Sequence, residues 1–480
     1  MFWLDRLVAG MLAPLAMWVL ASGLDDLFLD LCSIWFGIAG RRRQPAGTVP
    51  LPPAARENKI AVLIPAWRED AVIGQMLQRN LAAIQYANYE VFVGVYPNDL
   101  PTLSQVVACE AKDRRVHHVV CPHDGPTSKA DCLNWIYQGV LALEETAASR
   151  FEIVAHHDAE DVIHPSSLSW INSYSELYDM IQVPVLPLPT GWREFTHGAY
   201  CDEFAQSHLK DLHVRRRLGG FLPSCGVGTA YRRCVLDRLA WSNGNQPFQP
   251  DSLTEDYQVG LALHRLGCRQ ILLDAQRLGQ NGDPAATREY FPRRFRAAVR
   301  QKARWVAGIT LQSWQGIGWN AGPGQWYWLW RDRKGLVGHP VTVLANLVFL
   351  YGLFGWAEAL PAGSPWGLGE VISASRLLQW LLLINTALIL IGQVSRAWCA
   401  ATVYGWRHAS LSPLRSAWGN VINFAATVRA IGLFAGAQLR RQPPAWLKTE
   451  HRYPKAEALI QAGWKGHEEP AVLPPSTKMT

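Results

Sequence analysis

Three short motifs carry residue types that can do chemistry together, and they follow one another in a fixed order. His157-Asp158-Ala159-Glu160-Asp161 comes first, then Thr254-Glu255-Asp256, then Gln301-Lys302-Ala303-Arg304-Trp305. Paired carboxylates suit a hard divalent cation and the phosphates it carries, and a positioned acid can act as a general base. Arginine suits a diphosphate, and tryptophan offers a flat face to a sugar ring. Together the motifs predict a site that binds a nucleotide-sugar, holds a metal and deprotonates an acceptor hydroxyl.

The acidic motif has two interpretations. In an extended chain Asp158 and Glu160 project to the same side, where they can share a cation. Alternatively, the acids cap a helix expected to begin near Pro165. We expect His156 and His157 to orient or pack rather than to bind the metal.

The second motif precedes an amphipathic helix expected over 257–266. Its ordinary interpretation is a helix start, with Thr254 as the N-cap and the acids favoured by the helix dipole. A cap would also hold the neighbouring carboxylate in place. The two interpretations are therefore compatible, and Asp256 is the predicted general base.

The third motif lies in a helix expected to begin near Phe291. Gln301, Arg304 and Trp305 fall on one side of that helix by the three- and four-residue rule. The alternative is an amphipathic helix on a membrane surface, which is preferred for four other basic residues: Arg293, Arg294, Arg296 and Arg300.

Lys129 is expected to open a further helix, with a solvated lysine as the alternative. Gly226 and Gly228 either allow close approach of the backbone to a neighbour or form a plain turn.

Apolar strands alternating with helices must position these motifs. The expected strands are 60–64, 91–96, 153–155 and 183–186, with a helix over 71–81. This alternation predicts an α/β fold with a mostly parallel sheet covered by helices on both faces. Ligands bind at the carboxyl ends of the strands in such sheets. Four polar or aromatic residues follow expected strands: Trp67, Glu69, Asp99 and Asp158.

The composition indicates a membrane protein. Hydrophobic residues make up 49% of the chain and charged residues 18%, and there are 22 tryptophans. Residues 7–24 form an apolar run of transmembrane length, interpreted as an uncleaved anchor rather than a signal peptide. The shorter apolar stretch 27–39 is predicted to be an interfacial helix, and Arg41-Arg42-Arg43 marks the cytoplasmic side.

Residues 341–359 and 377–394 are predicted to form a transmembrane hairpin. Residues 421–439 are apolar but carry Asn423 and Arg429 near the centre. Because a central arginine is costly in a bilayer, a helix on the cytoplasmic surface is preferred to a fourth span.

Five segments follow from these patterns. The predicted boundaries are an anchor with an interfacial helix (1–43), a linker (44–58), a cytoplasmic α/β domain (59–314), interfacial helices with the hairpin (315–440) and a polar tail (441–480). The net charge of +7 suits an anionic membrane face and a diphosphate, and nucleic acid is not an expected partner. Nine scattered cysteines without a C-x-x-C pair favour reduced thiols over a zinc site.

The motifs resemble those of the family 2 inverting glycosyltransferases, in the membrane-embedded branch with cellulose, chitin and hyaluronan synthases. Lys129, in Ser128-Lys129-Ala130-Asp131-Cys132-Leu133-Asn134, resembles that family's conserved lysine segment, with Ser128 in place of a glycine. Stretches at 158–163, 253–260 and 448–454 are similar to the family type named for bacteriophage N4 adsorption. The resemblance implies an α/β GT-A fold with N- and C-terminal transmembrane helices, a nucleotide-sugar donor and Mg²⁺ or Mn²⁺.

The resemblance also implies roles for single residues. Asp256 would be catalytic, and Asp158 and Glu160 would hold the metal, with Asp161 as the neighbouring alternative to Glu160. Trp305 and Glu255 would bind the acceptor. The donor would be bound by Trp67, Glu69, Asp99, Lys129, Asp158, Gln301 and Arg304.

We therefore expect an enzyme of the bacterial inner membrane with its catalytic domain in the cytoplasm. It would transfer a sugar, with UDP as the expected nucleotide, to a growing surface polysaccharide. The alternatives are transfer of one sugar to a lipid carrier and a catalytically silent scaffold used in phage adsorption. Expected partners are the nucleotide-sugar, a glycan or lipid-linked acceptor, membrane lipids and a periplasmic or outer-membrane export partner.

Overall fold

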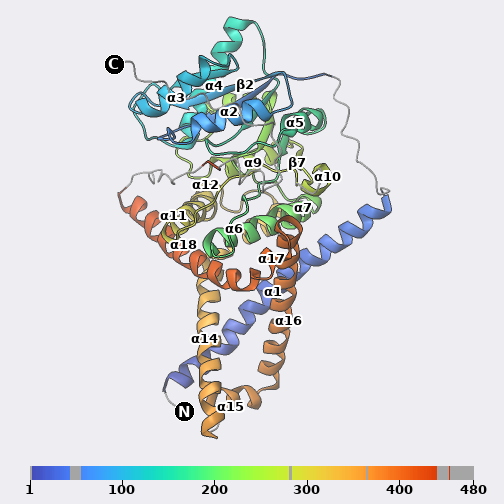
Figure 1. Ribbon diagram of the computed structural model, residues 1–480. Helices are drawn as coiled ribbons and strands as arrows, with labels where there is room; N and C mark the ends of the chain where they lie inside the picture. The colour runs from blue at the N-terminus through green and yellow to red at the C-terminus, as the bar shows by residue number, and fades with distance from the viewer. Residues whose placement is uncertain (1–2, 44–55, 280–283, 364–365, 441–452, 455–480) are drawn as a thin grey trace.

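A head built on one sheet stands on a narrower stem of long helices (Figure 1). The computed structural model describes residues 3–43, 56–279, 284–363, 366–440 and 453–454. Most of the predicted linker and tail, and most of the stretch 448–454, lie outside these residues.

Seven strands form the sheet of the head, in the order β3-β2-β1-β4-β6-β5-β7. β1 pairs in parallel with β2 and β4, and β2 pairs in parallel with β3. β6 runs antiparallel to β4 and β5, and β5 pairs in parallel with β7. The strands are β1 (Ile60–Pro65), β2 (Tyr89–Val95), β3 (Val116–Val120), β4 (Ile153–His156), β5 (Met180–Gln182), β6 (Thr229–Arg232) and β7 (Gln270–Leu272).

Helices cover both faces of the sheet. One core lies between the sheet and α2 (Ile73–Ala83), α3 (Leu100–Glu110) and α5 (Ser167–Ser175). The other lies beneath α4 (Lys129–Ala147), α8 (Arg233–Ser242) and α9 (Glu255–Arg265). The near-continuous apolar strands are buried on both sides, which confirms the predicted fold class.

The strand pattern differs from the prediction in two ways, a misplaced strand and three strands that were missed. The expected strand 183–186 begins after β5 has ended, and only Val185 makes an isolated bridge, with Thr287. β3, β6 and β7 were not predicted, because each is short and lacks a long apolar run.

The remaining helices of the head connect it to the stem. They are α6 (Phe195–Gln206), the π-helix η1 (Ser207–Asp211), α7 (Leu212–Arg217), α10 (Ala275–Leu278), α11 (Phe295–Trp305), the π-helix η2 (Val306–Gln312), α12 (Ser313–Ile317), α13 (Pro323–Arg333) and α17 (Trp406–Ala409).

The stem consists of α14 (Gly335–Ala362), α16 (Arg376–Tyr404) and the first half of α1 (Trp3–Arg43), with the short α15 (Gly367–Ala374) at its end (Figure 1). α14 and α16 contain the predicted hairpin. α1 is one continuous helix, whereas an anchor followed by a separate interfacial helix was expected. Ser22, Gly23 and the acidic pair Asp25-Asp26 suggested a break, but the helix continues through them because Arg331 and Lys334 pair with the two aspartates.

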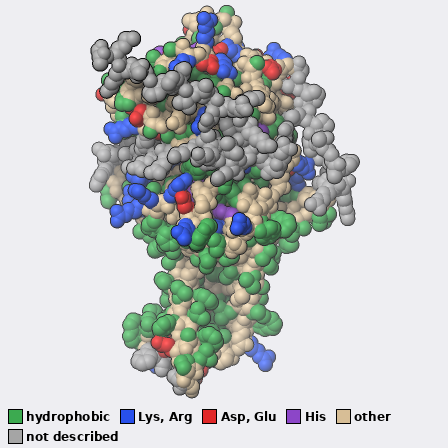
Figure 2. All heavy atoms as spheres, viewed as in Figure 1, with side chains coloured by type: hydrophobic (Ala, Val, Ile, Leu, Met, Phe, Trp, Pro, Cys, Tyr) green, Lys and Arg blue, Asp and Glu red, His purple; other side chains and the backbone are tan. Residues whose placement is uncertain are grey.

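Four helices in the described part of the chain are long and apolar enough to cross a membrane: α1, α14, α16 and α18 (Ser412–Arg440). α18 lies across the stem, beneath the head (Figure 1), and packs against α11 and η2 through Ala303, Ala307, Ala426 and Ala430. Hydrophobic side chains gather on the stem and on the underside of the head, with Lys and Arg above them (Figure 2).

Candidate functional site

A cavity of about 110 Å³ opens where the carboxyl ends of β1, β4 and β5 meet the start of the antiparallel β6. Because β6 is reversed, the loop before it reaches the same edge. The N-terminus of α9 and the C-terminal end of α11 complete the walls. Most predicted site residues line this cavity: Glu69, Lys129, Asp158, Glu160, Glu255, Asp256, Gln301, Arg304 and Trp305.

Lys129 joins the acidic motif to the loop before β6. α4 begins at Lys129 after the N-cap Ser128, whose hydroxyl accepts a hydrogen bond from the Asp131 amide. The ammonium lies 2.6 Å from the Asp158 carboxylate and donates to the Gly226 carbonyl at 3.2 Å. Burial alone would lower the pKa of Lys129, but attraction by Asp158 and the neighbouring acids raises it, so the side chain stays charged.

The acidic motif forms a turn rather than the predicted extended segment, since the Asp161 amide donates to the Asp158 carbonyl at 3.2 Å. Asp158 and Glu160 nevertheless both reach the cavity. Asp161 is fully buried and accepts a hydrogen bond from the Asp158 amide at 3.1 Å, and its carboxylate lies 2.7 Å from Nδ1 of His157. Burial lowers the pKa of His157 to about 3. Glu160, not Asp161, is therefore the second acid at the cavity.

Asp256 is positioned by the first turn of α9. One carboxylate oxygen, Oδ1, accepts a hydrogen bond from the Tyr257 amide at 2.7 Å. Thr254 occupies the N-cap position but makes no side-chain cap, which corrects the predicted capping. Gly226 has a φ of +73°, and a Cβ there would lie 2.7 Å from Asp256 Oδ2. The predicted close backbone approach at Gly226 is therefore present.

The pKa values of both acids of this turn are raised by their surroundings. Burial raises the pKa of Glu255 to about 7, and repulsion by Asp256 adds to the rise. Burial also raises the pKa of Asp256, although Lys129 and Arg304 favour its charged form. A carboxylate with a raised pKa is a better proton acceptor, as general-base chemistry requires.

The third motif presents three side chains to the cavity, as its spacing predicted. The Arg304 guanidinium has no hydrogen-bond or ion-pair partner among the described residues, and it faces an acidic cavity. The Trp305 ring packs on Tyr200 and Phe204, with centroid distances of 6.1 and 6.3 Å. An unpaired guanidinium beside an aromatic wall suits an anionic ligand that carries a ring.

Trp67 and Asp99 lie beside the cavity and do not line it. The Asp99 carboxylate accepts a hydrogen bond from the Arg68 amide at 2.5 Å, and Arg68 has a φ of +55°. The Trp67 ring packs edge-on against Tyr96, with centroids 5.3 Å apart. These residues shape the loop after β1, from which Glu69 reaches the cavity.

Several lining residues were not predicted as site residues, and four of them carry aromatic, thiol or carboxylate side chains. Phe204, Cys225, Glu289 and Phe291 come from α6 and from the segments before β6 and α11. None follows a predicted strand or belongs to a motif. The sequence carries no signal that places them there.

The carboxylates of the cavity fit a divalent cation whose coordination is completed by the phosphates of a bound ligand. Six carboxylates line the cavity against two cationic side chains: Glu69, Asp158, Glu160, Glu255, Asp256 and Glu289 against Lys129 and Arg304. Within the described ranges no group of three His, Cys, Asp or Glu residues is arranged to hold a metal by itself. Mg²⁺ commonly takes one or two carboxylates and obtains its other ligands from phosphates and water. His156 and His157 do not line the cavity, and His156 packs on Phe248.

Comparisons with known proteins agree with this geometry. The family described as Glycosyltransferase like family 2 matches residues 57–308. Bacteriophage adsorption protein B of Escherichia coli (strain K12) is 37% identical over 460 residues, which are 92% of this chain and 61% of that protein. Bacteriophage N4 adsorption protein B of Escherichia coli O157:H7 matches with the same identity and coverage. This chain thus spans less than two thirds of the length of either relative.

Among solved structures, the mannosyltransferase PcManGT from Pyrobaculum calidifontis, in complex with GDP-Man and Mn²⁺, is 16% identical. It has a TM-score of 0.48 and covers 88% of this chain and 99% of its own. The family match spans the sheet and all three motifs, and the adsorption-type resemblance is confirmed by the two Escherichia coli relatives. The chain belongs to glycosyltransferase family 2 and is a glycosyltransferase with the predicted GT-A-like fold.

Proposed function

We propose that the protein transfers a sugar from a nucleoside-diphosphate sugar, with UDP as the expected nucleotide, to a growing surface polysaccharide at the inner membrane. The observation that carries this proposal is the convergence of Lys129, Asp158, Asp256 and Arg304 on one acidic cavity. That cavity is bounded by Trp305, which also faces the membrane helices.

The donor diphosphate would bind between Arg304 and Lys129. Arg304 has no partner among the described residues that would have to be displaced, and the charge-assisted bonds of guanidinium to phosphate are strong. Asp158 and Glu160 would hold Mg²⁺ or Mn²⁺, which neutralises the negative charge of the departing diphosphate. The loop that carries Trp67 and Glu69, beside Asp99, would hold the nucleoside.

Asp256 would act as the general base. Its Oδ1 is held by the Tyr257 amide, which leaves Oδ2 to accept the proton of the acceptor hydroxyl. The acceptor oxygen then attacks the anomeric carbon on the side opposite the leaving nucleoside diphosphate, so the configuration inverts. Lys129 and Arg304 stabilise the negative charge that develops on the leaving group.

Trp305 and Glu255 would hold the acceptor. A second cavity of about 310 Å³ lies between α1, α13 and α14 and shares Trp305 with the first. It is lined on the membrane side by Trp18, Ser22 and Thr342. This cavity favours an acceptor that extends toward the bilayer, which suits a growing glycan or, as the second candidate, a single lipid-linked acceptor.

The pattern of exposed and buried side chains in α18 supports a particular arrangement of the helices in the membrane. In α18 the side chains of Ile422, Ala426 and Ala430 are buried, while Val421 and Val428 are exposed. Arg429 is also exposed, and the polar Asn423 accepts a hydrogen bond from Lys302 at 2.8 Å. These features support α18 as an interfacial helix, with α1, α14 and α16 as the spans.

The experiment uses the full chain in lipid nanodiscs with Mg²⁺ or Mn²⁺ and a panel of UDP-sugars. Nucleoside diphosphate release with one sugar is the expected result. Asp256→Asn should lower turnover by about 10²-fold or more with donor affinity unchanged, since general bases contribute about 10²–10⁴-fold. The matched control is Asp113→Asn, whose acid pairs with Arg115 on the head surface.

Product size separates the candidates. A ladder of glycan supports polymer synthesis, and one labelled lipid supports single transfer. Wild-type turnover in Asp256→Asn would contradict the assignment of the base. An absence of both nucleotide binding and turnover in the wild type would favour the scaffold.

A further inference from the structure

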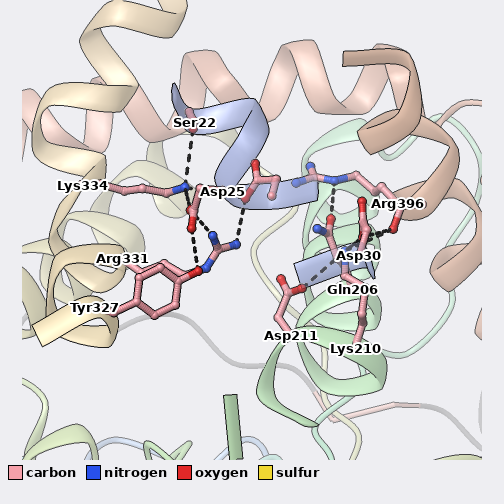
Figure 3. Close-up of polar contacts among 12 residues, drawn as sticks. Ser22, Asp25, Asp30, Gln206, Lys210, Asp211, Tyr327, Arg331, Lys334 and Arg396 are labelled. Carbon is pink, nitrogen blue, oxygen red and sulfur yellow. Dashed lines mark hydrogen bonds and ion pairs between the residues drawn. The ribbon is translucent and has the colours of Figure 1, made fainter. Parts of the chain in front are cut away.

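A cluster of buried and partly buried ion pairs joins α1 to the head just beyond the apolar run 7–24, and within it the side chain of Asp26 is 48% exposed. We call it the junction network and define it as Asp25, Asp26, Asp30, Lys210, Arg331 and Lys334. Figure 3 shows Tyr327, Arg331 and Lys334 converging on Asp25, with Lys210 beside Asp30. Buried charges persist only when they are paired, so these contacts fix α1 in one rotation and depth relative to the head.

The first arm of the network reaches α13. Arg331 pairs with Asp25 and, at 2.8 Å, with Asp26, while Lys334 lies 2.6 Å from Asp25. The Asp25 carboxylate also accepts a hydrogen bond from the Tyr327 hydroxyl at 2.6 Å. The side chain of Asp25 is only 6% exposed, so it depends on these partners.

The residue after Arg331 continues the path to the catalytic helix. The Asp332 carboxylate accepts a hydrogen bond from the Tyr257 hydroxyl at 2.7 Å and binds Arg215 through both oxygens, at 2.8 and 3.0 Å. Tyr257 follows Asp256, and its amide holds the Asp256 carboxylate. Two adjacent residues of α13 therefore connect α1 with the first turn of α9.

The second arm starts one turn further along α1. Lys210, in η1, pairs with Asp30, and Ser395 of α16 donates to Asp30 at 2.7 Å. His208, in the same π-helix, accepts a hydrogen bond from the Val185 amide at 3.3 Å and contacts Cys225 at 3.9 Å. Val185 and Cys225 line the catalytic cavity opposite α9.

We propose that the junction network positions Asp256, so that the seating of the N-terminal membrane helix sets the turnover of the cytoplasmic site. Tyr257 lines neither cavity, whereas Arg331 and Asp332 line the second cavity but not the catalytic one, so all three are positioning residues for Asp256. The inference rests on the proposed role of Asp256 as the base. It predicts that damage to the network lowers kcat, whereas donor binding at Arg304 and Lys129 is retained.

The test compares Arg331→Gln, Arg331→Lys and Tyr257→Phe in nanodiscs. Tyr257→Phe removes only the hydroxyl and keeps the ring, which packs edge-on against Phe221 with centroids 5.4 Å apart. We expect Arg331→Gln and Tyr257→Phe to lower kcat by roughly ten-fold or more, because misplacement by about 1 Å can cost about 10²-fold. Donor KM should stay unchanged, and Arg331→Lys, which keeps the charge, should restore much of kcat.

Arg233→Gln is the matched control for loss of a buried pair. Arg233 binds Glu144 at 2.8 Å and Asp237 at 2.6 Å, is 5% exposed, and ties α8 to α4 without contact to α1. It should lower the melting temperature and leave kcat intact. Equal loss of kcat in Arg233→Gln and Arg331→Gln, at equal loss of melting temperature, would overturn the proposal.

Hydrogen exchange gives a readout independent of activity. Amides over 255–265 should exchange faster in Arg331→Gln than in Arg233→Gln. If exchange is faster in Arg331→Gln but the wild-type protein transfers no sugar, the proposed function is contradicted and the link between α1 and α9 is retained. Unchanged exchange in an active protein would contradict that link alone.

Discussion

Replacement of Gly226 by alanine tests whether the placement of Asp256 controls turnover. Gly226 has a φ of +73°, where a side chain costs about 1–2 kcal/mol. The new Cβ would also lie 2.7 Å from Asp256 Oδ2, and ordinary contact begins at 3.4 Å. The carboxylate is the end of a short side chain, so it gives way before the backbone does. Displacement of the Asp256 carboxylate from 2.7 Å to ordinary contact distance should lower kcat by roughly 10–10²-fold.

Gly219→Ala separates the two effects. Gly219 has a φ of +79°, and a Cβ there meets nothing within 4 Å. It should show the same backbone cost in melting temperature without the loss of kcat. Both variants are assayed for nucleoside diphosphate release at saturating donor, and for donor affinity by calorimetry. Equal turnover in the two variants would refute the argument that the carboxylate is displaced, and so would a loss confined to donor affinity.

For three further substitutions, the charges in the cavity determine the direction of the expected effect. Asp158→Asn should raise the Mg²⁺ concentration needed for half-maximal turnover by about ten-fold or more, measured by metal titration; an unchanged requirement would contradict its role as a ligand. Lys129→Met removes a charge that lowers the pKa of Asp256, so the acid limb of kcat, measured with saturating donor, should move to higher pH. A limb that stays in place would show that Lys129 does not act on the base. The pKa of Glu255 is raised from 4.5 to about 7, so the folded protein loses stability as the pH rises from about 4.5 to about 7. Glu255→Gln should therefore raise the melting temperature more at pH 8 than at pH 5, with a gain of up to about 3 kcal/mol in unfolding free energy at pH 8. An equal gain at both pH values would contradict the raised pKa.

The parallel part of the sheet, and the edge of the sheet at which the motif residues meet, could be predicted because they depend on local sequence signals. Long apolar strands such as 60–64 and 91–96 are buried on both faces, and side chains after parallel strands meet at one edge. The spacing of Gln301, Arg304 and Trp305 needed only helical periodicity. These features required no knowledge of distant contacts.

The unpredicted features depend on tertiary contacts. The direction of β6 follows from its pairing with β4 and β5, and its four residues carry no mark of that direction. Glu289 and Phe291 reach the cavity because the segment after β7 returns beside the bridge at Val162. Likewise, the continuity of α1 through its acidic middle depends on Arg331 and Lys334, which lie some three hundred residues away.

The base and the third motif belong to one rigid unit because their helices meet through a glycine. Gly308, in the π-helix that follows Trp305, lies so close to Thr254 that a Cβ would be 2.5 Å from the threonine hydroxyl. Gln312 adds a hydrogen bond to the Leu253 amide at 2.9 Å. π-helical turns are often retained at functional sites, where they offset a helix locally. Here the offset turn brings the helix of Arg304 against the start of α9, so the guanidinium and the Asp256 carboxylate keep their spacing. Because α18 packs on this helix as well, the proposed membrane surface would be connected to the proposed base through the helix of Arg304 in addition to the path through Arg331.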